Sequence, residues 1–142
     1  MIRVWRAEDT RAVAEIERVS FPDPWSEEML EESLENPAFS GFVSEENGEV
    51  TGYVGLLCVY DAEIALIAVR PQNRRSGVGG ALLAEALKYA RSKGCKNVFL
   101  EVRTGNAPAR AMYEKAGFVP VYVRKNYYGE GQDALVMVNS VP

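Results

Sequence analysis

The stretch RPQNRRSGVGGALLAEAL, residues 70–87, decides the fold because a strand end, a glycine-rich turn and a helix follow one another within it. The apolar segment before it, AEIALIAV at residues 62–69, indicates a buried strand. From Val78 apolar residues recur at helical spacing as far as Gly94, and NVFLEV at residues 97–102 indicates another strand. This order predicts a βαβ unit with two parallel strands in one sheet.

The remaining segments predict a mixed sheet around this unit, in an α+β or α/β sandwich. Strand patterns occupy residues 2–6, 39–44, 50–60, 118–123 and 133–138. Helical patterns with capping residues occupy residues 8–21, 26–36 and 106–117. Asn47-Gly48 predicts a hairpin between the second and third strands, and Asp9 or Thr10 is the expected cap of the first helix.

Length and composition indicate one globular domain spanning residues 1–142. The chain is 47% apolar and 25% charged, which is ordinary for a globular protein. Its longest uncharged apolar run, residues 50–60, is about half the roughly 20 residues that a membrane-spanning helix needs. The first ten residues contain no apolar secretory segment. We therefore expect a cytoplasmic protein without a membrane anchor.

Charge and missing residue types exclude several classes of function. The net charge is −4 and no long basic run is present, so a general nucleic-acid binder is not expected. The sequence contains no histidine, which excludes Ser-His-Asp and Cys-His catalysis and histidine-based metal sites. Cys58 and Cys95 lack C-x-x-C spacing and are expected to be reduced core residues. Acid-base chemistry must therefore use Asp, Glu, Tyr, Lys, Cys or water.

The glycine turn is a candidate anion site. A helix N-terminus presents unpaired N–H groups, glycine allows close approach to them, and Arg74 and Arg75 add positive charge. The spacing fits neither the phosphate loop G-x-x-x-x-G-K-[ST] nor the dinucleotide motif G-x-G-x-x-G. The alternative is a solvated arginine turn whose glycines serve only the bend from strand to helix.

Two segments resemble the GCN5-related N-acetyltransferases, the GNAT superfamily. RRSGVG at residues 74–79 resembles the R/Q-x-x-G-x-G/A loop of that superfamily. FLEVRTGNAPARAMYEKAGF at residues 99–118 resembles a segment of the branch that acetylates ribosomal-protein alanines and archaeal protein N-termini. PWS at residues 24–26 and KNYYGEGQDALVM at residues 125–137 also fit that branch, so the resemblance covers nearly the whole chain.

The resemblance implies a fold, a cosubstrate and its site. The fold is a mostly antiparallel mixed sheet with a central splayed pair of parallel strands and about four flanking helices. The cosubstrate is acetyl-coenzyme A, and no metal is expected. The residues implied to bind it are Ile67, Ala68, Val69, Arg74, Arg75, Ser76, Gly77, Val78, Gly79, Gly80 and Asn106.

Glu101 is the candidate base and Tyr113 the candidate acid. An amine attacks a thioester only as the free base, and a carboxylate can take up the proton through water. Glu101 lies in a strand expected to be covered on both faces, where the alternatives are an exposed strand end or a pair with Arg103. By resemblance Tyr113 protonates the departing thiolate, in a transfer that unperturbed thiol and phenol pKa values make nearly balanced. The alternative is a plain core tyrosine.

Two aromatic-rich loops are candidates for binding the acceptor. Their residues are Phe21, Pro22, Trp25, Tyr127 and Tyr128. The resemblance implies that these loops flank a groove for the first residues of an acceptor protein, although Trp25 equally suits a helix anchor.

The function expected from these features is acetyl transfer from acetyl-coenzyme A to the free α-amine of a protein in a direct ternary complex. The acceptor is the N-terminal alanine of a ribosomal protein or a broader set of N-termini. The alternatives are acetylation of a small-molecule amine or a protein lysine, and a coenzyme A-binding module without turnover. We expect a monomer or weak homodimer.

Overall fold

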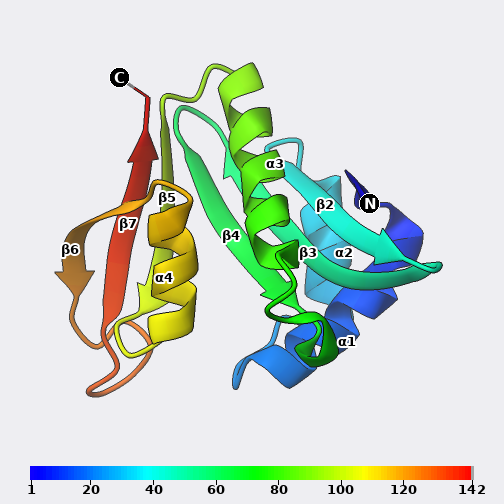
Figure 1. The fold of residues 1–142 in the computed structure, drawn as a ribbon, viewed down its shortest axis with the longest axis horizontal. Helices are drawn as coiled ribbons and strands as arrows, with labels where there is room; N and C mark the ends of the chain where they lie inside the picture. Colours follow the sequence, from blue (N-terminus) through cyan, green and yellow to red (C-terminus); the bar gives the residue numbers. More distant parts are fainter. Residues whose placement is uncertain (142) are drawn as a thin grey trace.

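The computed structural model describes residues 1–141, which form one seven-stranded sheet with helices on both faces (Figure 1). The strands are β1 (Ile2–Val4), β2 (Phe39–Glu46), β3 (Glu49–Cys58), β4 (Ala62–Val69), β5 (Asn97–Arg103), β6 (Val119–Arg124) and β7 (Ala134–Ser140). The α-helices are α1 (Thr10–Ser20), α2 (Glu27–Glu35), α3 (Val78–Ser92) and α4 (Ala107–Lys115), and short 3-10 turns occupy Ala7–Asp9 and Pro71–Asn73. The strand order is β1-β2-β3-β4-β5-β7-β6, and only β4 and β5 are parallel neighbours. The predicted mostly antiparallel sheet with four helices is confirmed.

The parallel strands β4 and β5 separate soon after they begin. They pair only at Ala62 with Val98 and at Glu63 with Phe99, and Figure 1 shows them diverging beyond that point. The C-terminal end of β4, Ile67–Val69, is therefore half-buried, whereas its composition predicted burial on both faces. The predicted splay is confirmed, and it opens the sheet at its centre.

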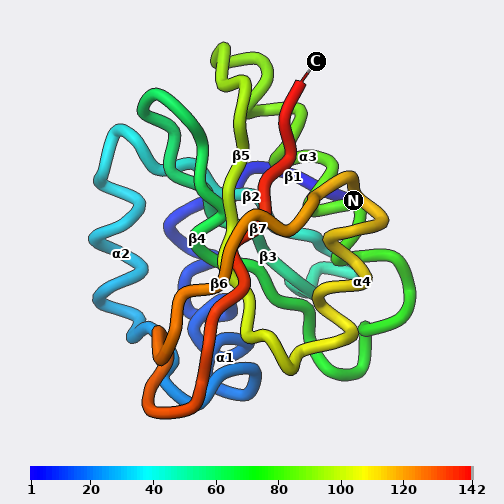
Figure 2. Tube along the Cα trace, turned by 90° about the vertical axis from the view of Figure 1, so that its left-hand side faces the viewer, coloured from blue at the N-terminus to red at the C-terminus, as the bar shows by residue number. Residues whose placement is uncertain are grey.

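Two layers of helices cover different parts of the sheet, and α2 and α4 lie on opposite sides of it (Figure 2). On one face α3 buries an apolar stripe, and Tyr113 of α4 joins the same core. The stripe consists of Leu82, Leu83, Ala86 and Ala90. On the other face α1 and α2 pack against Trp5 and against residues of β2, β3 and β4. The apolar core under α1 and α2 therefore does not extend to β5, β7 and β6.

Local signals place most element ends as predicted. Ser26 Oγ accepts from the Met29 amide at 3.1 Å and Asn106 Oδ1 accepts from the Ala109 amide at 3.3 Å, which are ordinary N-cap bonds. Gly94 and Gly117 end α3 and α4 with φ values of 82° and 96°. Within residues 1–141, no helix is both long and apolar enough to cross a membrane.

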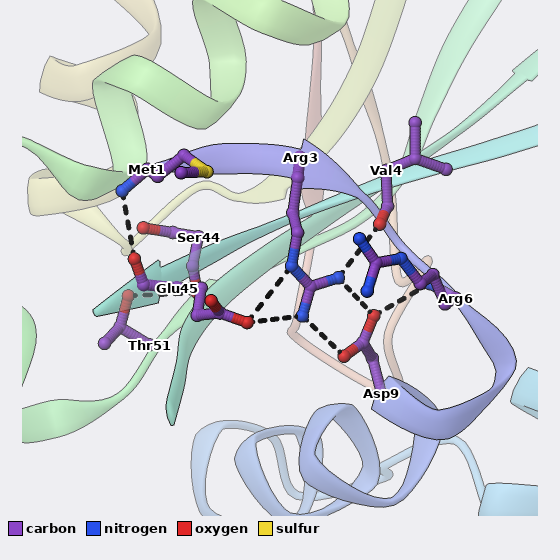
Figure 3. A network of polar contacts seen from close by, with 8 residues as sticks. All are labelled: Met1, Arg3, Val4, Arg6, Asp9, Ser44, Glu45 and Thr51. Atoms are coloured by element: carbon purple, nitrogen blue, oxygen red, sulfur yellow. Dashed lines mark hydrogen bonds and ion pairs between the residues drawn. The ribbon is translucent and has the colours of Figure 1, made fainter. Parts of the chain in front are cut away.

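An arginine-centred network ties β1 and β2 to the start of α1 (Figure 3). The Arg3 guanidinium donates to both Asp9 oxygens at 2.7 and 2.9 Å and to Glu45 at 2.7 Å. Asp9 occupies the predicted N-cap position, but its carboxylate accepts from the Arg6 amide at 2.8 Å instead of from the first turn of α1. The hydrogen bonds from Arg3 hold the pKa of Asp9 below its usual value.

Candidate active site

A cleft of about 580 Å³ lies where β4 and β5 diverge. It collects side chains from α1, the loop after α1, both splayed strands, α4 and the β6–β7 loop. The predicted site residues that line it are Phe21, Pro22, Trp25, Ile67, Glu101, Asn106, Tyr113, Tyr127 and Tyr128. The structure therefore brings both predicted catalytic residues and all five predicted acceptor residues to one cleft.

Glu101 faces this cleft from the middle of β5. The strand is buried on one face only, through Val98, Leu100 and Val102, because neither α1 nor α2 reaches the other face. The expectation of cover on both faces is thus wrong. The Glu101 side chain is still only 18% exposed, and its Oε2 is buried without a hydrogen-bond partner in residues 1–141. Its Oε1 lies 4.0 Å from Arg124 Nε.

Arg103 lies two residues further along the same face of β5 and does not pair with Glu101. Its guanidinium donates to Gln132 and stacks over the Tyr128 ring at 4.3 Å from the ring centre. The alternative that Glu101 is a partner of Arg103 is therefore wrong. A buried carboxylate oxygen without a donor is costly in a structural residue and useful in a proton acceptor.

Tyr113 reaches the cleft from α4. Its side chain is 7% exposed and meets Phe118 edge-on with ring centres 6.1 Å apart. Its hydroxyl forms no hydrogen bond within the described chain. Burial, and to a lesser degree Tyr128, raises the pKa of Tyr113 to about 12. Proton transfer from Tyr113 to a thiolate is therefore less favourable than unperturbed pKa values suggest. The hydroxyl stays protonated at neutral pH.

The β6–β7 loop brings a pair of tyrosines to the cleft. Tyr127 and Tyr128 meet edge-on with ring centres 5.0 Å apart, and Tyr127 is 50% exposed. The neighbouring Glu101 carboxylate raises the pKa of Tyr127. Asp133 closes the loop by accepting from the Asn126 amide at 2.9 Å.

The N-terminus of α3 combines unpaired amides with open space beside two of its glycines. Gly77 is left-handed with φ 85°, and a Cβ added at Gly77 or Gly80 would meet no atom within 4 Å. The amides of residues 78–80 form no hydrogen bond within residues 1–141, and the first bond of the turn runs from the Ala81 amide to the Gly77 carbonyl. This backbone suits an anionic group such as a pyrophosphate.

Other residues of the predicted cosubstrate set have structural contacts as well. Arg74 donates to the Val69 carbonyl at 2.9 Å and to Ser20 Oγ at 3.2 Å, so it joins the turn to β4 and α1. Ser76 donates to the Asn73 carbonyl. A Cβ at Gly79 would lie 2.6 Å from Met112 Sδ, so this glycine also allows α3 and α4 to approach each other.

Both cysteines are free, and neither lines the cleft. Cys95 is buried, and Cys58 at the end of β3 packs against the same core. Burial raises the pKa of Cys58 to about 11, which is opposite to the activation that a nucleophilic cysteine needs.

Several residues that line the cleft were not predicted from the sequence, above all a buried carboxylate on α1. The unpredicted residues are Glu17, Ser20, Asp23, Ile64, Ala65, Leu66, Leu100, Val102 and Arg103. Glu17 stands four residues after Val13 on the buried face of α1. A glutamate on an apolar helix face is the signal that could have found it.

Comparisons with known proteins identify the family of this chain. Residues 10–118 match the model of the Acetyltransferase (GNAT) family. A putative ribosomal protein bS18-alanine N-acetyltransferase of Bacillus subtilis is 40% identical, over 96% of this chain and 92% of the relative. An N-alpha-acetyltransferase of Sulfurisphaera tokodaii is 34% identical, over 96% of this chain and 90% of the relative. The crystal structure of the ribosomal-protein-S18-alanine N-acetyltransferase from Escherichia coli has a TM-score of 0.90 at 30% identity, covering 99% of this chain and 93% of that chain.

The chain belongs to the GNAT family of acetyltransferases. It is an N-acetyltransferase, as predicted, and members of this family use acetyl-coenzyme A as the acetyl donor.

Proposed function

We propose that this protein acetylates the α-amine at the N-terminus of another protein, with Glu101 as the base and Tyr113 as the acid. The observation that carries the proposal is the buried, unpartnered Glu101 oxygen in the same cleft as a protonated Tyr113. The names of the relatives from Bacillus subtilis and Sulfurisphaera tokodaii support an α-amine acceptor.

An α-amine is favoured as the acceptor because a larger fraction of it is neutral at pH 7 than of a lysine amine. An α-amine with a pKa near 8 is about 10% neutral at pH 7, whereas a lysine near 10.4 is neutral to less than about 0.1%. A single carboxylate that receives the proton, directly or through one water, therefore has less to supply for an α-amine than for a lysine. Glu101 has one oxygen free for this task.

Tyr113 completes the proton balance. Glu101 takes up the proton of the bound ammonium and so yields the free amine, whose nitrogen then forms its bond to the acetyl carbon as the carbon–sulfur bond breaks and a second nitrogen proton leaves to solvent. The departing sulfur needs a donor, and Tyr113 stays protonated at neutral pH because burial raises its pKa to about 12. It first donates a hydrogen bond and then the proton, which solvent returns.

Acetyl-coenzyme A supplies the activated acetyl group when bound, and the site fits its chemistry. The open amides at the start of α3 suit the pyrophosphate. The β5-facing backbone of β4 beyond Glu63 has no strand partner and suits an amide-containing arm. The residues that we propose to hold it are Ile67, Ala68, Val69, Arg74, Arg75, Ser76, Gly77, Val78, Gly79, Gly80 and Asn106.

The acceptor enters between the two aromatic loops. Phe21 and Tyr127 are 40% and 50% exposed, and both line the cleft, so apolar surface is available to the first residues of a peptide. We propose that the acceptor is a ribosomal-protein alanine or a broader set of N-termini, and that the reaction takes place in the cytoplasm.

A thiol-release assay tests this function. Acetyl-coenzyme A is incubated with short peptides that begin Ala, Ser, Met-Leu or Met-Glu, each with a free and a blocked α-amine. Release that requires the free α-amine supports the proposal, and the ranking of first residues separates a narrow enzyme from a broad one. Turnover of a polyamine or of an N-terminally blocked lysine peptide, but of none of the free peptides, would refute it.

A further inference from the structure

Helix α1 buries a glutamate at the edge of the cleft between β4 and β5, which is called the acceptor cleft below. Glu17 is 2% exposed and lines the cleft together with the loop that follows α1. No basic side chain lies within 4.0 Å of its carboxylate in residues 1–141. Burial of a carboxylate is expensive, so hydrogen bonds that define a geometry must compensate for it.

Both oxygens of Glu17 have donors, and the donors come from different parts of the fold. Tyr53, which is fully buried in β3, donates its hydroxyl to Oε1 at 2.5 Å. The Trp25 backbone amide donates to Oε2 at 2.8 Å. The first contact fixes the carboxylate to the centre of the sheet, and the second fixes the loop to the carboxylate.

The main chain of Glu17 holds the other end of the same loop. Its carbonyl accepts from the Phe21 amide at 3.1 Å. One residue therefore binds the loop where it leaves α1 and again just before Ser26 caps α2. The loop segment held in this way runs from Phe21 to Trp25, and Phe21, Pro22 and Trp25 all line the cleft.

We infer that Glu17 is a positioning residue for the acceptor: its carboxylate joins Tyr53 to the Trp25 amide and so holds the Phe21–Trp25 loop in the shape that binds the incoming N-terminus. This inference rests on the proposed function. Glu17 acts through the loop and takes no proton from the acceptor.

Loss of the hydrogen bonds from Tyr53 and Trp25 to Glu17 should affect binding of the acceptor peptide. A free loop must be ordered each time an acceptor binds, so the KM for the peptide rises. Glu101 and Tyr113 stand on other elements, so kcat changes little. The Glu17 carboxylate bonds neither the start of α3 nor the end of β4, so the KM for acetyl-coenzyme A should stay within about twofold.

Three variants of the full chain separate geometry from charge and from stability. Glu17→Ala removes both hydrogen bonds. Glu17→Gln keeps them, because its oxygen accepts from the Trp25 amide and its NH2 group donates to the Tyr53 hydroxyl. Thr10→Val is the matched control: Thr10 is 2% exposed on the same helix and accepts from Trp5 Nε1 at 3.1 Å, far from the loop.

Two readouts are needed. The first is hydrogen exchange of the Trp25 amide by NMR, which reports the link without any acetylation. The second is steady-state kinetics with the best peptide from the panel above. For Glu17→Ala we expect at least about tenfold faster Trp25 exchange and about a tenfold higher peptide KM, with kcat and the KM for acetyl-coenzyme A within about twofold.

The outcomes are decisive in each direction. Glu17→Gln and Thr10→Val should stay within about threefold of the wild type in both readouts. A Glu17→Gln loss as large as that of Glu17→Ala would assign the effect to charge and overturn the inference, as would unchanged Trp25 exchange in Glu17→Ala. If the wild type acetylates no peptide, the proposed function fails, while the exchange data still decide whether Glu17 holds the loop.

Discussion

Replacing Glu101 with glutamine should lower kcat/KM for a peptide acceptor about 100-fold at pH 7, within the usual contribution of a general base. Glutamine keeps the size of the side chain, and Glu101 has no hydrogen-bonded partner at Oε2 that the substitution would break. Its contact with Arg124 is 4.0 Å long and that arginine is half-exposed, so little stability is lost. The thermal midpoint and coenzyme A affinity should therefore match those of the wild type.

The size of the defect should depend on pH. Without a base, Glu101→Gln can use only acceptors that arrive neutral. With a pKa near 8, that fraction rises from about 10% at pH 7 to about 90% at pH 9. The ratio of wild-type to variant kcat/KM should therefore fall about ninefold between these pH values, from about 100 to about 11.

Initial rates of thiol release across pH 6.5–9.5 check both numbers, with Glu63→Gln as the matched control. Glu63 lies on β4 and borders a neighbouring hollow of about 360 Å³ that also touches Glu101, but it does not line the catalytic cleft. Glu63→Gln should retain at least about half of the wild-type rate. A Glu101→Gln rate within threefold of the wild type at pH 7 would refute the assignment, and a 100-fold loss that does not change with pH would assign Glu101 to acceptor binding instead.

Three further variants test the acid, the scaffold and the core. Tyr113→Phe should lower kcat about 100-fold in the thiol-release assay, and its thermal midpoint should change little because the hydroxyl has no partner within residues 1–141; a kcat unchanged within threefold would contradict the role of acid. Asp9→Asn should lower the urea midpoint at pH 7 by the equivalent of about 1.5–3 kcal/mol. Because Arg3 depresses the pKa of Asp9, this contribution is present above the unfolded value of about 3.9 and should vanish as the pH falls through the lower folded pKa; a constant difference down to pH 2 would contradict it. Leu82→Ala, at a fully buried position, should cost about 2–5 kcal/mol in the free energy of unfolding, and a loss below 1 kcal/mol would show that α3 packs otherwise.

Much of the fold could be predicted because its signals are local. The turn at Asn47-Gly48 and the helix ends at Gly94 and Gly117 depend on the backbone preferences of one or two residues, and the cap at Ser26 depends on one side-chain hydrogen bond. The apolar period of α3 likewise identified the face that is buried. The splayed strand pair was expected only through the family resemblance, because the sequence of an apolar strand does not indicate where its pairing with a neighbouring strand ends.

Site residues within a recognisable sequence motif were predicted, whereas residues whose role depends on tertiary contacts were missed. Glu101 and Tyr113 lie in a recognisable sequence segment. The prediction that β5 is covered on both faces was wrong, because that cover depends on how far α1 and α2 extend across the sheet. Glu17 has no such segment around it. Its role depends on Tyr53, which is 36 residues away in the sequence and meets it only in the folded protein.

These contacts connect the N-terminal network to the acceptor cleft through a single helix. Arg3 and Asp9 hold the start of α1 against β1 and β2, and Glu17 near its end holds the loop that borders the cleft. The two sets of contacts lie at opposite ends of this 11-residue helix, and the side-chain bond to the loop comes from Glu17. The base on β5 and the acid on α4 do not belong to this path. The Phe21–Trp25 loop and the two proton-transfer residues are therefore held by separate parts of the fold, and substitutions that break the Glu17 contacts should raise the KM for the acceptor before they lower the rate of the chemical step.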